Sequence, residues 1–155
     1  MREGGKGFDF LGFHHRYVRG RTRRSRHLTF LACWLSRKAM QHARDRIRQL
    51  TARERLLLSV EDVVQDVNNF LRGWAGYFRY GNSTRPFDKI GTYALVRLSL
   101  FVAKRHHRSR SFGWLLVAHE SPNHMGLINL NGCVVAPRPH RPWREKPNAG
   151  GKGRR

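Results

Sequence analysis

The stretch Phe70-Leu71-Arg72-Gly73-Trp74-Ala75-Gly76-Tyr77-Phe78-Arg79-Tyr80-Gly81-Asn82 gathers aromatic residues, glycines and arginines into one short run. If residues advance by about 100° each, a helix that begins near Val60 carries a continuous apolar face through this run. The residues on that face are Val63, Val64, Val67, Phe70, Leu71, Trp74, Tyr77 and Phe78. An apolar face of this length has to be buried, so the stretch predicts a mainly α fold in which residues 60–78 form one helix of a small bundle.

The polar side of the same helix predicts a binding surface. Arg72 and Arg79 lie on the flank opposite the apolar face. Gly73 and Gly76 also lie off that face, where each glycine costs about 0.5–1 kcal/mol relative to alanine. We therefore expect something to approach the backbone there, which makes the two arginines candidate phosphate contacts, with a merely solvated face as the alternative.

Aromatic residues near the end of this helix divide into two groups. Tyr80 and Asn82 follow the apolar face, so Tyr80 is a candidate for stacking on an unpaired base and Asn82 for a further contact to the same ligand. Trp74, Tyr77 and Phe78 lie on the apolar face, and we expect them to pack in the core rather than to stack on bases.

The charge of the chain indicates the kind of partner. The chain has 31 lysine and arginine residues against 10 acidic ones, a net charge of +21 and a pI of about 11.7. Nucleic acid is the first candidate, because each phosphate contact releases condensed counterions. An anionic membrane is the rival, but no apolar run approaches the roughly 18 residues of a membrane span and no signal-peptide core follows the start. We expect a cytoplasmic protein that binds nucleic acid.

Candidate catalytic and metal-binding residues are few. Cys33 and Cys133 cannot form a disulfide framework or a four-cysteine zinc site. The segment His119-Glu120-Ser121-Pro122-Asn123-His124 contains the residue types of an HNH endonuclease, but the longer ββα-metal unit of that fold has no counterpart here. We predict no catalytic residue, no metal site and no cofactor.

Residues 1–35 predict a β-hairpin with a cationic tip. The run from Phe8 to Phe13 alternates like a strand and continues to Tyr17, and a second strand places Leu28, Phe30, Ala32 and Trp34 on one face. Few acids lie near the basic turn between these strands, so phosphate binding is favoured over mere solubilising charge. The phosphate-binding candidates of the turn are Arg21, Arg23, Arg24 and Arg26.

Residues 36–110 predict a domain of three helices. Ser36 is the expected N-cap of the first, near 36–50, and Ser59 of the second. The third, at 87–106, is apolar almost all round in its middle, which is typical of the central buried helix of a bundle. The nucleic-acid-binding candidates on the basic face of the first helix are Arg37, Arg44 and Arg48.

The third helix ends in a basic cluster. Cations are favoured at the carbonyl end of a helix, and few acids lie nearby to neutralise them. We therefore favour phosphate binding over solubilising charge for this cluster as well. Its nucleic-acid-binding candidates are Lys104, Arg105, His106, His107, Arg108 and Arg110.

The C-terminal part carries weaker signals. Within a small accessory segment, residues 111–136, the apolar run 114–117 fits either a strand or a helix. Residues 127–130 and 133–135 are joined by Asn131-Gly132, which favours a small hairpin. The tail, residues 137–155, is rich in proline, glycine and basic residues and is expected to be partly disordered without a polyanion.

Two blocks of the sequence resemble one family. Phe8-Asp9-Phe10-Leu11-Gly12-Phe13 resembles the last block of group II intron reverse transcriptases, where the palm passes into the thumb. The signature of the group II intron maturase-specific domain is similar to Leu71-Arg72-Gly73-Trp74-Ala75-Gly76-Tyr77-Phe78-Arg79, Gly81-Asn82-Ser83 and Phe87-Asp88-Lys89-Ile90. Together the two blocks cover roughly residues 8–110 in the order of the family.

The resemblance implies a thumb and maturase module that binds structured group II intron RNA and assists its folding and splicing. In full-length form such a protein copies the intron into DNA. No Tyr-x-Asp-Asp box precedes the thumb block, so the fingers and palm are missing and we expect a truncated reading frame without polymerase activity of its own. Two alternatives stay open: a piece of a split RNA-directed DNA polymerase, and a generic basic remnant that binds RNA or DNA.

Overall fold

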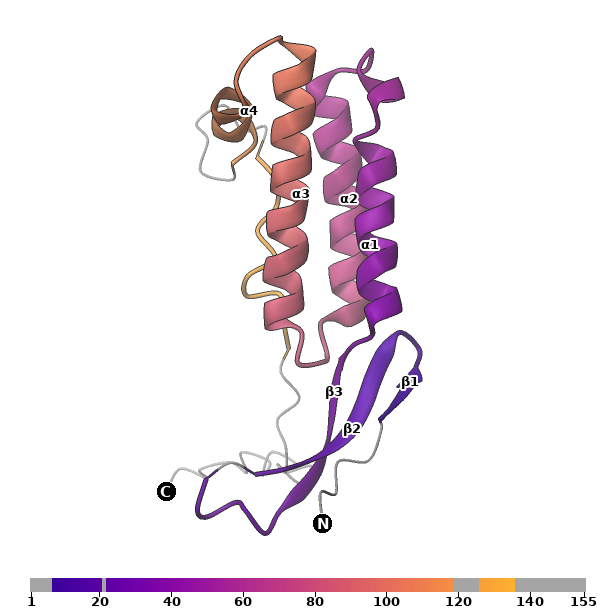
Figure 1. Ribbon diagram of the computed structural model, residues 1–155, viewed down its shortest axis with the longest axis vertical. Helices are drawn as coiled ribbons and strands as arrows, with labels where there is room; N and C mark the ends of the chain where they lie inside the picture. Colours follow the sequence, from indigo (N-terminus) through magenta and orange to yellow (C-terminus); the bar gives the residue numbers. More distant parts are fainter. Residues whose placement is uncertain (1–6, 21, 119–125, 136–155) are drawn as a thin grey trace, which may run out of the picture.

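A computed structural model of the protein describes residues 7–20, 22–118 and 126–135 (Figure 1). A small sheet forms one end of the described structure, and a bundle of helices forms the rest. The elements are β1 (Phe8–Phe10), β2 (Phe13–Arg19), β3 (Thr29–Leu35), α1 (Arg37–Leu50), the 3₁₀ turn η1 (Arg53–Arg55), α2 (Val60–Phe78), α3 (Thr84–Arg105) and α4 (Arg110–Val117). The predicted mainly α fold with an N-terminal β element is confirmed.

The sheet has three antiparallel strands in the order β1-β2-β3. The prediction of one strand from Phe8 to Tyr17 is wrong, because Leu11 and Gly12 take positive φ angles of 49° and 81° and reverse the chain. Phe10 then pairs directly with Phe13. Two successive residues with positive φ form the tight turn of a hairpin. The sequence pattern did not reveal this turn, because apolar residues alternate in the same way on both sides of it. The predicted hairpin is the β2–β3 pair.

Serine side chains start three of the helices. The Ser36 hydroxyl accepts the Ala39 N–H at 3.1 Å, and the Ser59 hydroxyl accepts the Asp62 N–H at 3.0 Å. At α4, Ser109 accepts the Phe112 N–H at 3.3 Å. Each bond satisfies a backbone donor that has no partner within the helix, so the starts predicted at Ser36 and Ser59 are confirmed.

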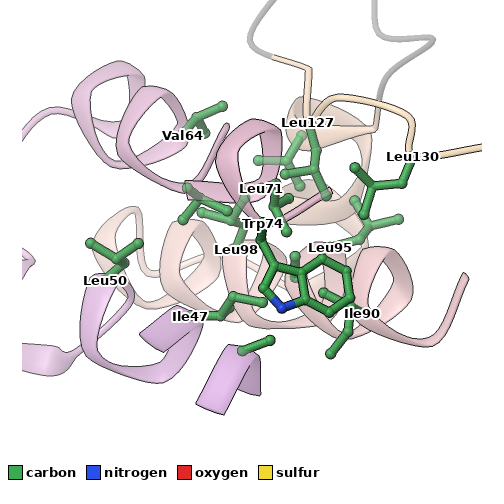
Figure 2. Close-up of a cluster of buried hydrophobic side chains, with 14 of the residues drawn as sticks. Ile47, Leu50, Val64, Leu71, Trp74, Ile90, Leu95, Leu98, Leu127 and Leu130 are labelled. Atoms are coloured by element: carbon green, nitrogen blue, oxygen red, sulfur yellow. The ribbon is translucent and has the colours of Figure 1, made fainter. Parts of the chain in front are cut away.

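Helix α3 is the centre of the bundle, as predicted. Helices α1 and α2 lie on one side of it and α4 on the other (Figure 1). The segment 126–135 also contacts α2, because Asn68 of that helix bonds to Gly126 and Ile128. Figure 2 shows apolar side chains from α1, α2, α3 and residues 127 and 130 directed into one cluster. The largest fully buried side chains are Ile47, Val63, Val67, Leu71, Phe87, Ile90, Leu98, Val102 and Val117.

The apolar run 114–117, which the sequence left undecided, forms the end of α4. Gly113 lets this short helix approach α3, because a Cβ atom at this position would lie 2.1 Å from the Ser99 carbonyl oxygen. No flexible side chain separates the two helices there, so only glycine fits. Val117 is consequently fully buried, while Leu115 is 70% exposed.

The prediction of a small hairpin around Asn131-Gly132 is correct for the turn but wrong for the two strands. The turn itself forms, with a φ of 86° at Gly132 and a 3.2 Å bond from Cys133 N–H to the Leu130 carbonyl, but the residues on either side of it are not paired as strands. An isolated two-stranded ribbon buries little apolar surface, whereas Leu127 and Leu130 are almost fully buried in the core of the bundle. The predicted disordered tail, residues 137–155, lies outside the described residues.

Candidate nucleic-acid interface

The outer face of α2 carries two glycines that meet no side chain in the described part of the chain. A Cβ atom added at Gly73 or Gly76 would have no neighbour within 4 Å among the atoms of the structure. Arg72 lies on this face and donates to the Asn69 side-chain oxygen at 3.3 Å. The approach to the backbone that the glycines predict is therefore not made by the described part of this chain, and the face is open to another molecule.

Arg79 and Tyr80 form an exposed pair where α2 ends. The Arg79 guanidinium carbon lies 5.0 Å from the centre of the Tyr80 ring, within the range of a cation–π contact. The Tyr80 ring is 59% exposed, and the Arg79 backbone carbonyl accepts the Val135 N–H at 2.7 Å. The backbone is thus fixed while both side chains face solvent, as a stacking and phosphate-binding pair requires.

Tyr77 differs from its predicted place in the core, whereas Trp74 and Phe78 are buried as expected. Tyr77 is 53% exposed; its ring stacks on Phe13 with centres 6.3 Å apart, and its hydroxyl donates to the Leu11 carbonyl at 3.1 Å. It lies at the margin of the helix face, where the sheet covers only one side of the ring. Tyr77 therefore joins α2 to the β1–β2 turn.

Arginines at the tip of the β2–β3 hairpin project into solvent. Arg23, Arg24 and Arg26 are exposed, and none is ion-paired within the described residues. The turn is closed by Thr22 and Ser25, whose hydroxyl oxygens lie 2.7 Å apart. Arg21, the fourth candidate here, lies outside the described residues. The tip therefore presents exposed positive charge on a defined turn, with no ion pair to it from the described residues.

The basic face of α1 is partly neutralised. Arg37 is exposed and Arg44 is half-buried, both on the flank that the sequence predicts. Arg48 pairs with Asp45 at 3.0 Å, and the same carboxylate oxygen accepts the Gln41 amide at 3.0 Å. Arg48 therefore presents less net positive charge than Arg37.

The basic cluster at the end of α3 has a defined backbone. The N–H groups of His107 and Arg108 bond the carbonyls of Lys104 and Ala103, a Schellman arrangement, and His107 has the positive φ of 50° that this motif requires. Arg105 donates to the carbonyls of Leu56 and Leu58 and so holds the α1–α2 loop. The exposed members that face solvent are Lys104, His106, His107, Arg108 and Arg110.

The predicted residues do not form one patch. The hairpin tip lies at the sheet end of the molecule, and the end of α3 lies at the opposite end (Figure 1). Helix α1 runs between them, and α2 ends beside the sheet. The cations are therefore distributed along the molecule, which suits a large polyanion better than a small ligand.

The sequence did not indicate a hollow between the sheet and the start of α3. It has a volume of about 970 Å³ and is lined by β2, β3 and residues 82–86. Among its lining residues are His14, Arg16, Trp34 and Arg85. The alternation along β2 places His14 and Arg16 on one face of the sheet, but the contact that brings Arg85 opposite them is tertiary: the Asn82 N–H donates to the Cys33 carbonyl at 2.9 Å. We call this hollow the sheet groove.

Two other kinds of site are absent from the described residues. No helix in these ranges is long and apolar enough to cross a membrane. Within 7–20, 22–118 and 126–135, no three histidine, cysteine, aspartate or glutamate side chains come together as metal ligands would. The segment 119–124, considered above for an HNH site, lies outside the described residues.

The model of one protein family matches this chain. It is described as "Group II intron, maturase-specific domain", and it matches residues 40–118, just over half of the chain. No curated protein matches the sequence. The matched region runs from within α1 to the end of α4 and contains the open face of α2, the Arg79–Tyr80 pair and the basic end of α3. The chain belongs to the family of group II intron maturase-specific domains.

Proposed function

We propose that this protein binds group II intron RNA and assists its folding into the splicing-competent form. The observation that carries the proposal is the outer face of α2, inside the region of the family match. There Gly73 and Gly76 leave the backbone open, Arg72 lies on the same helix, and Arg79 is its C-cap residue. A phosphate backbone is the ligand that such a face fits, because it is polyanionic and approaches closely only where no Cβ intervenes.

The mechanism needs no covalent chemistry. Cations at the hairpin tip, on α1, beside α2 and at the end of α3 contact successive phosphates of a folded RNA. A protein that binds the active fold of the RNA more tightly than misfolded forms shifts the population by the difference in affinity. Splicing assistance then follows from shape-selective binding.

A binding experiment with matched charge changes tests the proposal. Affinities for the cognate intron RNA and for an unrelated structured RNA are measured by fluorescence anisotropy over a salt series centred on about 0.2 M. We expect tighter binding of the intron. The double variant Arg72→Gln/Arg79→Gln should make the slope of log K against log salt shallower. The change should correspond to the loss of about two phosphate contacts, roughly one for each arginine.

The control variant is Arg46→Gln/Arg53→Gln, which removes the same charge from exposed positions outside the predicted interface. It should change the salt dependence less. Equal affinities for the two RNAs would contradict intron binding, and equal losses in the two double variants would show a generic effect of charge.

A second candidate function has its own supporting observation. The face of the sheet turned away from the sheet groove leaves Phe8, Phe10, Tyr17 and Leu31 between 48% and 70% exposed. A covering protein surface would explain this, and a palm subunit of a split reverse transcriptase is the occupant that the Phe8–Phe13 block suggests. Co-purification of a polypeptide with paired metal-binding aspartates, with template-dependent DNA synthesis by the complex, would support it; a complex without synthesis would contradict it.

A further inference from the structure

The sheet groove combines an aromatic floor with cationic walls. Trp34 and Phe30 of β3 lie on the floor with Val18 of β2, and all three are half-buried, so part of each side chain is accessible. Arg16 of β2 and Arg85 of α3 are exposed at its sides. No carboxylate is among the described lining residues; the nearest in the sheet, Asp9, is bonded to His14 at 2.7 Å.

The wall formed by residues 82–86 is fixed in place before any ligand binds. The Asn82 N–H donates to the Cys33 carbonyl of β3, and the fully buried Ser83 hydroxyl donates to the Phe78 carbonyl at 2.8 Å. A Cβ atom at Gly81 would lie 2.8 Å from the Phe13 ring, so the turn packs tightly against the sheet. A preformed groove binds without the cost of ordering its walls.

We infer that the sheet groove binds an unpaired segment of nucleic acid, with a base stacked on Trp34 and flanking phosphates held by Arg16 and Arg85. The inference rests on the proposed function in taking nucleic acid as the ligand. A cationic ridge is sufficient for a duplex, whose bases cover each other, but an accessible aromatic ring between cations favours a single strand. The volume of about 970 Å³ is at the upper end of the range of small-molecule sites, about 300–1,000 Å³, so the groove can hold at least one whole nucleotide.

Binding of short labelled oligonucleotides tests this inference. The probes are an unstructured oligouridylate, an oligothymidylate of the same length and a double-stranded RNA of matched charge, each measured by anisotropy. Trp34→Ala should weaken binding of the single strands about tenfold and of the duplex by less than about twofold. Trp34→Phe, which keeps an aromatic face, should restore most of the affinity. A larger loss for oligouridylate than for oligothymidylate would identify RNA as the preferred single strand.

Trp114→Ala is the matched control, since Trp114 of α4 is 38% exposed and does not line the groove. Photocrosslinking of an oligouridylate that carries 4-thiouridine provides a second measurement on the unaltered chain, independent of whether Trp34→Ala folds. Crosslinks within 14–20 or 82–86 support the inference. Crosslinks confined to other segments, or equal losses for single strand and duplex, overturn it.

The outcomes separate this inference from the proposed function. If Trp34→Ala binds the intron RNA and the oligouridylate as tightly as the unaltered protein, the groove is not a strand site and intron binding still stands. If the unaltered protein shows no preference for intron RNA but loses single-strand affinity on Trp34→Ala, the groove site stands and the proposed function fails.

Discussion

The helical bundle and the N-terminal sheet differ in how far they bury their own apolar residues. In the bundle, Leu71, Phe87 and Leu98 are fully buried. In the sheet, Phe8 and Phe10 are 58% and 59% exposed, and only Ala32 and Leu35 are buried. The family match begins inside α1 and leaves the sheet out. The comparison indicates that the bundle is stabilised from within, whereas the sheet keeps its apolar face for contacts beyond the described chain.

The largest expected effect is in the bundle. Phe87→Ala should lower the free energy of unfolding by about 3–5 kcal/mol, because it removes a fully buried ring that contacts Trp74, with ring centres 5.2 Å apart. Phe10→Ala is the matched change in the sheet and should cost less than about 1 kcal/mol, since the ring is mostly exposed. Urea unfolding followed by circular dichroism measures both.

A comparable loss of stability in both variants would contradict this difference between the sheet and the bundle. It would show that the Phe10 ring is buried in the protein in solution, by a second copy or by a segment outside the described residues. The oligomeric state, measured by sedimentation at the same concentration, distinguishes these two cases.

The next effect concerns the segment 126–135, which packs against the bundle. Asn68 of α2 is buried; its amide donates to the Gly126 carbonyl at 3.3 Å and its oxygen accepts the Ile128 N–H at 2.9 Å. Asn68→Ala should cost about 1–3 kcal/mol, because two backbone groups lose their partner. Hydrogen exchange at Ile128 should become faster.

The neighbouring residue supplies the control for this change. Asn69 is exposed, and its bonds within the described residues are to the surface side chains of Gln65 and Arg72. Asn69→Ala should change stability by less than about 0.5 kcal/mol. Unchanged exchange at Ile128 in Asn68→Ala would mean that burial of Leu127 and Leu130 alone holds the segment.

The sequence was sufficient for the helices because their signals are local. The caps at Ser36 and Ser59 and the apolar spacing of α2 depend on residues within one or two turns, and the structure confirms them. The segment 126–135 was mispredicted because its partner is Asn68, about 60 residues away, and no local pattern reports that contact. The sheet groove was missed for the same reason, since Arg85 reaches it only through the packing of residues 82–86 on β3.

The junction between sheet and bundle gives a third prediction. Gly12 has a φ of 81°, and a Cβ atom there would lie 3.0 Å from the Phe78 ring. Gly12→Ala should therefore cost about 1–2 kcal/mol through backbone strain alone, with a further loss unless the ring moves. Thermal unfolding checks the cost, and Gly132→Ala, at a φ of 86° with no neighbour within 4 Å, isolates the strain from the contact. Equal losses of stability in Gly12→Ala and Gly132→Ala would show that the Phe78 ring moves aside at no cost.

The smallest effect separates stability from binding on the outer face of α2. Gly73→Ala should raise the free energy of unfolding by about 0.5–1 kcal/mol, because the methyl group meets nothing within 4 Å and alanine favours the helix. If RNA approaches the backbone there, the same methyl group should weaken intron binding while the protein becomes more stable. Ala75→Gly, at a buried position of the same helix, should lower stability without touching that face. A gain in stability with unchanged intron affinity would place the RNA elsewhere, and the glycines of α2 would then need another explanation than close approach by a partner.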